Sequence, residues 1–162
     1  VVPQFDRFIP RDMLAGQRPG TLTIADTEIG DTICYDIAYD DVIRDLVDDG
    51  AQMLVVQTSN AAFTGTAQPE QQWDISRLRA IETGRWLVVP STNGITGVID
   101  ADGDVVQRAP QRVPATIEQE IRLASGRTPG VVVGGAIEYL VVGLALVGWA
   151  LGVRRGRTEQ QG

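Results

Sequence analysis

Histidine is absent from this chain of 162 residues, and cysteine occurs once, as Cys34. Every one of the 14 basic residues is an arginine, so lysine is absent as well. One thiol permits no internal disulfide, and without imidazoles a zinc or haem site has almost no ligands. The formal net charge of −7, without a basic stripe, disfavours nucleic acid as a partner. We therefore expect no metal, no cofactor and no nucleic acid.

The chain begins with Val1 and Val2, without an initiator methionine or a charged-then-apolar signal region. A start of this kind is typical of a fragment, because a complete reading frame opens with methionine. We expect the chain to be a piece of a longer protein.

One long apolar run lies near the C-terminus. Residues 130–153 read GVVVGGAIEYLVVGLALVGWALGV, with Glu138 as the single charge, and RRGR follows at once. At about 1.5 Å per residue, such a helix crosses a hydrocarbon core of roughly 30 Å, so we predict one transmembrane helix. A buried helix of a soluble domain is the alternative. The basic tail, 154–162, favours a cytoplasmic C-terminus in a cell membrane, with residues 1–129 on the extracytoplasmic side.

Residues 1–129 alternate between strand and helix patterns. Apolar β-rich runs alternate twice with amphipathic helical patterns, and the turn Asp102-Gly103 separates two final short strands. In the second helix we expect Trp73, Leu78 and Ile81 to form the buried face. Two βαβ units with a hairpin edge predict a layered α/β domain. The predicted strands are 21–24, 28–34, 53–57, 86–90, 97–100 and 104–107, and the predicted helices are 38–49 and 69–84.

Polar side chains follow three of these strands at their carboxyl ends, the edge where α/β sheets bind ligands. Cys34 ends one strand, residues 58–60 follow the next, and residues 92–93 follow the third. A thiol at a strand-to-helix junction meets backbone amides that can stabilise a thiolate or an oxyanion. A buried structural cysteine is the alternative. Without histidine, a nucleophilic role needs a carboxylate or an amine as its base.

Six short stretches of the chain belong together by their order and spacing. They are VVPQFDRFIP at 1–10, TICYDI at 32–37, TSNAAF at 58–63, RLRAIETGR at 77–85, STNGITGVID at 91–100 and GRTP at 126–129. Together they resemble the apolipoprotein N-acyltransferases, the membrane branch of the carbon–nitrogen hydrolase (nitrilase) superfamily, whose nucleophile segment usually reads I-C-Y-E.

The resemblance implies a fold and a reaction. It implies that residues 1–129 are the C-terminal part of a nitrilase-like αββα sandwich, followed by one transmembrane helix. Cys34 would take an acyl chain from a phospholipid as a thioester and pass it to the N-terminal diacylglyceryl-cysteine of an apolipoprotein. The family's triad lysine and glutamate would lie before Val1, in an upstream part that carries a membrane bundle. We therefore expect this chain alone to be inactive.

The resemblance also assigns residues. Asp6 and Asp36 stand where the family has glutamates, and we expect both to assist Cys34 in catalysis. For each, a solvated loop acid is the alternative. The aromatic and amide side chains expected to bind substrate are Tyr35, Asn60, Phe63 and Asn93.

Other polar residues of the matching stretches have expected structural roles. Glu82 is expected to tie loops together. Arg77, Arg79 and Arg85 are expected to be solvated or ion-paired, rather than to bind phosphate.

Two other functions remain open. An amidase or nitrilase acting on a soluble C–N bond would share Cys34 but leaves the membrane span unexplained. A membrane-anchored, non-catalytic module that binds lipoprotein or a partner enzyme would need no triad.

Overall fold

The computed structural model describes residue 16 and residues 20–159. Its six strands form one sheet whose spatial order follows the chain. The central strands β2, β3 and β4 run parallel, while β1 and the pair β5–β6 add antiparallel edges. Both predicted βαβ units and the predicted hairpin are confirmed. The strands are β1 (Thr21–Ile24), β2 (Thr27–Ile33), β3 (Met53–Gln57), β4 (Leu87–Val89), β5 (Gly97–Ile99) and β6 (Val105–Arg108).

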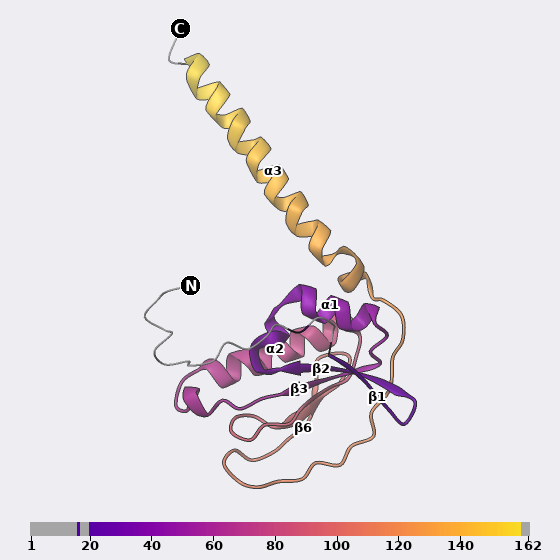
Figure 1. Cartoon of the computed structure of the whole chain (residues 1–162). Helices are drawn as coiled ribbons and strands as arrows, with labels where there is room; N and C mark the ends of the chain where they lie inside the picture. The colour runs from indigo at the N-terminus through magenta and orange to yellow at the C-terminus, as the bar shows by residue number, and fades with distance from the viewer. Residues whose placement is uncertain (1–15, 17–19, 160–162) are drawn as a thin grey trace.

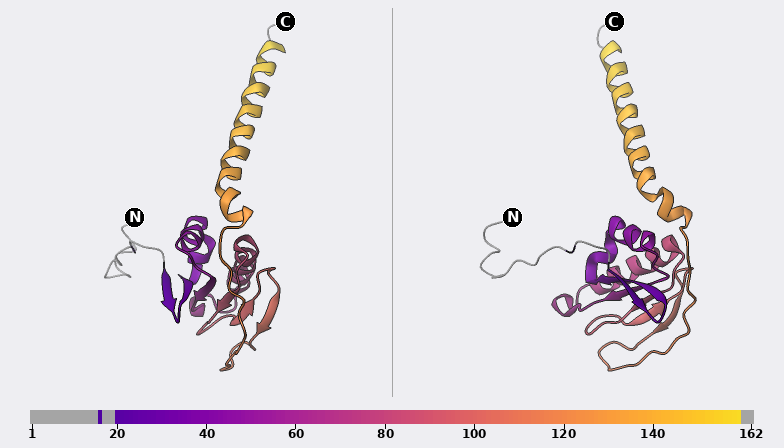
Figure 2. Two further views of the ribbon diagram at one scale, coloured as in Figure 1. Left: turned by 90° about the vertical axis from the view of Figure 1, so that its right-hand side faces the viewer. Right: turned by 45° about the vertical axis from the view of Figure 1, so that its right-hand side comes forward.

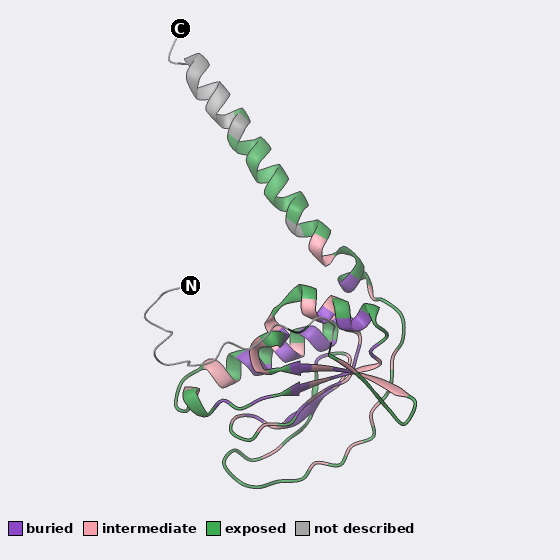
Figure 3. Cartoon of the chain, viewed as in Figure 1, coloured by how far each residue is buried: buried purple, intermediate pink, exposed green. Residues whose placement is uncertain are grey.

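Two helices, α1 (Asp40–Asp48) and α2 (Gln68–Thr83), cover one face of the sheet (Figure 1). Leu54 and Val56 of β3 point into this layer, and both are fully buried. Figure 3 shows the buried residues concentrated between the sheet and these helices. The core is formed by Ile37, Ile43, Leu46, Ala51, Leu54, Val56, Trp73, Ala80, Leu87, Val89, Ile95 and Ile99.

The buried face of α2 differs from the prediction. Trp73 is buried as expected, but Leu78 is 64% exposed and Ile81 is 54% exposed, so their assignment to that face is wrong. The helix turns polar residues inward because their side chains bind backbone groups of neighbouring loops, which satisfies them without water. The buried residues of α2 are Gln72, Trp73, Ser76, Arg79, Ala80 and Thr83.

The other face of the sheet, here called the second face, carries half-buried apolar side chains beside the polar residues Asp31 and Gln57. Register places Ile29 beside Met53, and Val55 beside Val88, on the side opposite Leu54. The segment 109–127 passes along part of this face on its way to the last helix (Figures 1 and 2), where the amide of Ala124 donates to the Gln52 carbonyl. The second face therefore offers a surface for a further layer.

The last helix, α3 (Pro129–Glu159), rises from the layer of α1 and α2 on the side away from the sheet (Figure 2). Within Pro129–Trp149, a run of 18 residues has a mean hydropathy of 2.1, and 6% of that run is buried. By length and composition this stretch can cross a membrane.

Two polar side chains fix the start of α3. The Thr128 hydroxyl donates to the Glu82 carbonyl at the end of α2 and accepts from the Val131 amide at 3.3 Å, so it caps both helices. Arg85 is 1% exposed and donates to the carbonyls of Ala51 and Gly126.

Arg85 also donates to the Thr83 carbonyl at 2.7 Å. Burial lowers the pKa of Arg85. Contrary to expectation, the described residues leave Arg85 neither solvated nor ion-paired, because backbone carbonyls take its N–H groups.

Replacing the guanidinium of Arg85 tests its role in fixing the start of α3. We expect Arg85→Lys to lower the free energy of unfolding by about 2 kcal/mol, because an ammonium cannot reach three carbonyls and leaves buried acceptors unpaired. Urea denaturation of the protein in detergent, followed by circular dichroism, measures the change. Arg122→Lys, at an exposed position, is the control and should have almost no effect. Equal stability of both variants would contradict the assignment.

Candidate active site

Cys34 stands at the carboxyl end of β2 and begins a short 3-10 helix, η1 (Cys34–Ala38). Its φ is 56°, in the left-handed region that residues with a side chain rarely adopt. Its side chain is half-buried. A backbone conformation of this kind persists only when surrounding contacts hold it, and it is typical of functional positions.

The α-helix predicted to start at residue 38 starts later. η1 occupies the first five residues after β2, Tyr39 is extended with φ −91° and ψ 121°, and α1 begins at Asp40. The thiol is therefore carried by the first residue of a tight turn, and α1 begins only after this turn.

Gln72 of α2 holds this turn. Its Nε2 donates to the Cys34 carbonyl at 3.2 Å. Its Oε1 accepts from Asn60 Nδ2 at 2.8 Å and from Thr58 Oγ1 at 3.3 Å. Gln72 was not identified from the sequence as a residue of the site. Its position beside the core residue Trp73 was the available signal, because a buried glutamine needs hydrogen-bond partners.

The ends of β3 and β4 meet at Asn60. This side chain is 2% exposed, and its backbone amide donates to the Asn93 carbonyl at 2.6 Å. Gly94, with φ 137°, passes so close that a Cβ would lie 2.4 Å from Asn60 Oδ1. Only glycine fits there. Cys34, Asn60 and Asn93 are thus brought to one edge, as predicted from the strand ends.

The other candidate residues occupy different surroundings. Asp36 is exposed, and its Oδ2 accepts from the Ile33 amide at 3.2 Å, so the carboxylate braces the turn that carries Cys34. Tyr35, next to the thiol, and Phe63, at the end of the short helix η2 (Ala61–Phe63), are half-buried. Asp6 lies outside the described residues.

Three cavities within the described residues open at this edge. The first, of about 440 Å³, is lined in part by Ile33, the residue before the thiol, whose side chain is 66% exposed. The second, of about 280 Å³, is bordered by Asn60, Asn93 and Gly94. The third, of about 650 Å³, is bordered by Asn93, Gly94 and residues of the segment 109–115. An exposed apolar residue in the lining of the first cavity suits a substrate with an apolar part. The first cavity is lined by Ile33, Gln57, Thr58, Ser59, Pro90, Ser91 and Thr92.

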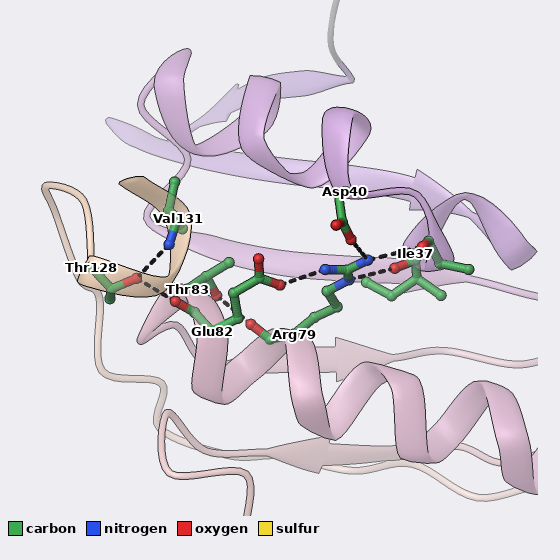
Figure 4. A network of polar contacts seen from close by, with 8 residues as sticks. Ile37, Asp40, Arg79, Glu82, Thr83, Thr128 and Val131 are labelled. Atoms are coloured by element: carbon green, nitrogen blue, oxygen red, sulfur yellow. Dashed lines mark hydrogen bonds and ion pairs between the residues drawn. The ribbon is translucent and has the colours of Figure 1, made fainter. Parts of the chain in front are cut away.

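Arg79 forms a second polar cluster behind the turn (Figure 4). Its Nη1 lies 2.5 Å from Glu82, and its Nη2 pairs with Asp40. Burial lowers the pKa of Arg79, but the hydrogen bonds and charges of Glu82 and Asp40 outweigh it, and the net pKa is raised. Arg79 is ion-paired, as expected. The Glu82 carboxylate pairs with Arg79 of the same helix, whereas the backbone carbonyl of Glu82 accepts the hydrogen bond from Thr128.

The fold and the site agree with a family comparison. The family model described as carbon-nitrogen hydrolase matches residues 4–128. The chain therefore belongs to the carbon–nitrogen hydrolase family.

Curated relatives within this family share one name. Apolipoprotein N-acyltransferase of Mycolicibacterium smegmatis is 35% identical over 135 residues, which cover 83% of this chain and 22% of that protein. Its counterpart in Shewanella oneidensis is 33% identical over 133 residues, covering 82% and 25%. The chain thus spans about a quarter of the length of these relatives.

A solved structure shares the fold. It is a mutant of the amidase from Nesterenkonia sp. AN1, in which acrylamide has added to the active-site cysteine. The TM-score is 0.50 at 22% identity, and the match covers 60% of this chain and 40% of the amidase. The predicted nitrilase-like α/β fold is confirmed.

The role of Gln72 can be tested directly. We expect Gln72→Leu to lower the free energy of unfolding by about 1–3 kcal/mol, because Asn60 and the Cys34 carbonyl lose a buried partner. Gln71→Leu, at the neighbouring exposed position, is the matched control. Chemical denaturation compares them, and equal midpoints would show that Gln72 does not support the turn.

Proposed function

We propose that this chain is part of an apolipoprotein N-acyltransferase and that Cys34 is its nucleophile. The observation that carries the proposal is the strained cysteine at the carboxyl edge of the parallel strands, in a chain of this family whose curated relatives bear that name. The exposed Ile33 in the lining of one cavity and the long apolar helix α3 support a lipid substrate.

The proposed reaction uses the Cys34 thiol, in a chain that has no histidine to activate it. The thiolate attacks the ester carbonyl of a phospholipid acyl chain, a C–S bond forms, and the C–O bond breaks as the lysophospholipid leaves with the proton that the base took from the thiol. The α-amino group of a diacylglyceryl-cysteine then attacks the thioester, so that a C–N bond forms, the C–S bond breaks and a proton from the amine returns to the sulfur. Amide formation requires that water reach the thioester slowly.

The candidate residues have proposed places in this reaction. Asp36 braces the turn at Ile33, so we infer that it acts through the position of Cys34. Asn60 links the segments that follow β3 and β4 and binds Gln72, so we infer that it supports the site through these contacts. Asp6 is proposed to assist the thiol, and Tyr35, Phe63 and Asn93 to contact the acyl chain or the lipoprotein.

The base is proposed to come from an upstream part of the protein. A lysine and a glutamate there would complete the triad, and a strand layer there would cover the second face of the sheet. The half-buried apolar residues Ile29, Met53, Val55 and Val88 support this arrangement, because they need a covering layer.

The membrane arrangement is part of the same proposal. Residues 1–129 form the C-terminal part of the catalytic domain, 130–153 the membrane helix and 154–162 the basic tail. We place the catalytic part on the extracytoplasmic side and the tail in the cytoplasm, beside a membrane bundle of the same protein.

Covalent acylation tests the nucleophile. Full-length protein mixed with phospholipid should gain the mass of one acyl chain at Cys34, and Cys34→Ala should gain none. Intact-protein mass spectrometry measures both. The adduct should disappear when a diacylglyceryl-cysteine peptide is added, because the amine accepts the chain. An unmodified Cys34 in protein that still transfers acyl chains would refute the assignment.

The alternatives give different results. A C–N amidohydrolase, which the fold shared with the amidase favours, would release ammonia from a soluble amide and form no lipid adduct. A non-catalytic module would form no adduct with either substrate. Residues 1–162 alone should also form none, because they lack the proposed base.

A further inference from the structure

The turn that carries Cys34 is held at its far end by a second side chain of α2. Arg79 is 9% exposed, and its Nε donates to the Ile37 carbonyl at 2.9 Å. Its Nη2 donates to the Ala38 carbonyl, also at 2.9 Å. These carbonyls close η1, whereas Gln72 binds the carbonyl that opens it. The turn is therefore clamped at both ends by α2.

Two carboxylates fix the guanidinium in this position. Asp40 starts α1, and Glu82 lies one turn further along α2, on the same face as Arg79. A planar guanidinium that meets two carbonyls and two carboxylates has a single favourable orientation. Figure 4 shows Arg79 between these groups. The far end of the turn thus has little freedom to shift.

The same cluster reaches α3. Thr128, which caps α3, donates to the carbonyl of Glu82. At Gly130 a Cβ would lie 3.0 Å from that carbonyl oxygen, so α3 begins directly against the end of α2. One residue, Glu82, therefore connects the two: its backbone carbonyl meets the start of α3, and its carboxylate pairs with Arg79.

We propose that Arg79 is a positioning residue for Cys34, which holds the turn in register with α2 and with the start of α3. The proposal rests on the function proposed above. Within the described residues, the hydrogen bonds of Arg79 go to the far end of the turn and to carboxylates, so it acts through the backbone. A five-residue turn with a strained first residue transmits a shift of its last carbonyls to the first residue.

Single-turnover acylation separates positioning from a merely structural role. In the full-length protein with phospholipid, the amplitude of the covalent adduct counts correctly folded molecules, and the rate constant reports how well the thiol is aligned. We expect Arg79→Met to keep most of the amplitude and to lower the rate constant by about tenfold or more, because small misplacements of a reacting group are costly. A merely structural role would lower the amplitude and leave the rate constant unchanged.

A matched control lies on the same helix. Arg77 donates to the Gly103 carbonyl at 2.8 Å, away from η1, so Arg77→Met should acylate at the wild-type rate. Should Arg79→Met yield no folded protein, Arg79→Lys and Glu82→Gln replace it, and each should slow acylation several-fold with its amplitude kept.

The outcomes are distinct. A wild-type rate constant in Arg79→Met, or in both replacement variants, overturns the positioning role. Failure of the wild-type protein to acylate at Cys34 overturns the proposed function instead.

Discussion

The fixed conformation of one five-residue turn is the constraint on which the site depends. Cys34 has a left-handed backbone, and η1 is too short to hold itself with its own hydrogen bonds. Its carbonyls are instead bound by Gln72 and Arg79, two polar side chains from the buried face of α2. Because both come from one rigid helix, the two ends of the turn cannot move independently. The strained backbone of Cys34 is therefore maintained by hydrogen bonds from α2 to the backbone carbonyls of the turn.

This constraint explains why α2 has an unusual buried face. A helix that only packed on the sheet would turn Leu78 and Ile81 inward, as its apolar pattern predicts. The observed helix leaves both exposed and buries polar residues, since each has a specific backbone or side-chain partner. Along this face, α2 buries less apolar surface than its sequence allows, and its buried polar side chains instead fix the conformation of the turn η1.

Strand positions and the parallel order could be predicted because they depend on local patterns. The apolar runs 53–57 and 86–90 have the length of buried strands, and Asp102-Gly103 marks a turn. The edge that gathers Cys34, Asn60 and Asn93 followed from the topology alone.

The turn after Cys34 and the role of Gln72 could not be predicted in the same way. They depend on contacts between side chains of α2 and backbone carbonyls of a turn far away in the sequence. Hydrophobic periodicity does not show which carbonyls will need a hydrogen-bond donor. For the same reason, the prediction that Leu78 lies on the buried face of α2 was wrong.

The position of α3 relative to the thiol constrains how a lipid could reach it. Gln72 binds the Cys34 carbonyl near the beginning of α2, and Glu82 meets Thr128 near its end. Ten residues of helix between them correspond to about 15 Å. α3 rises away from the sheet at the far end of α2 from the Gln72 contact with Cys34 (Figures 1 and 2). In the reaction proposed above, an acyl chain would therefore have to span the length of α2 between the start of α3 and the turn that carries Cys34.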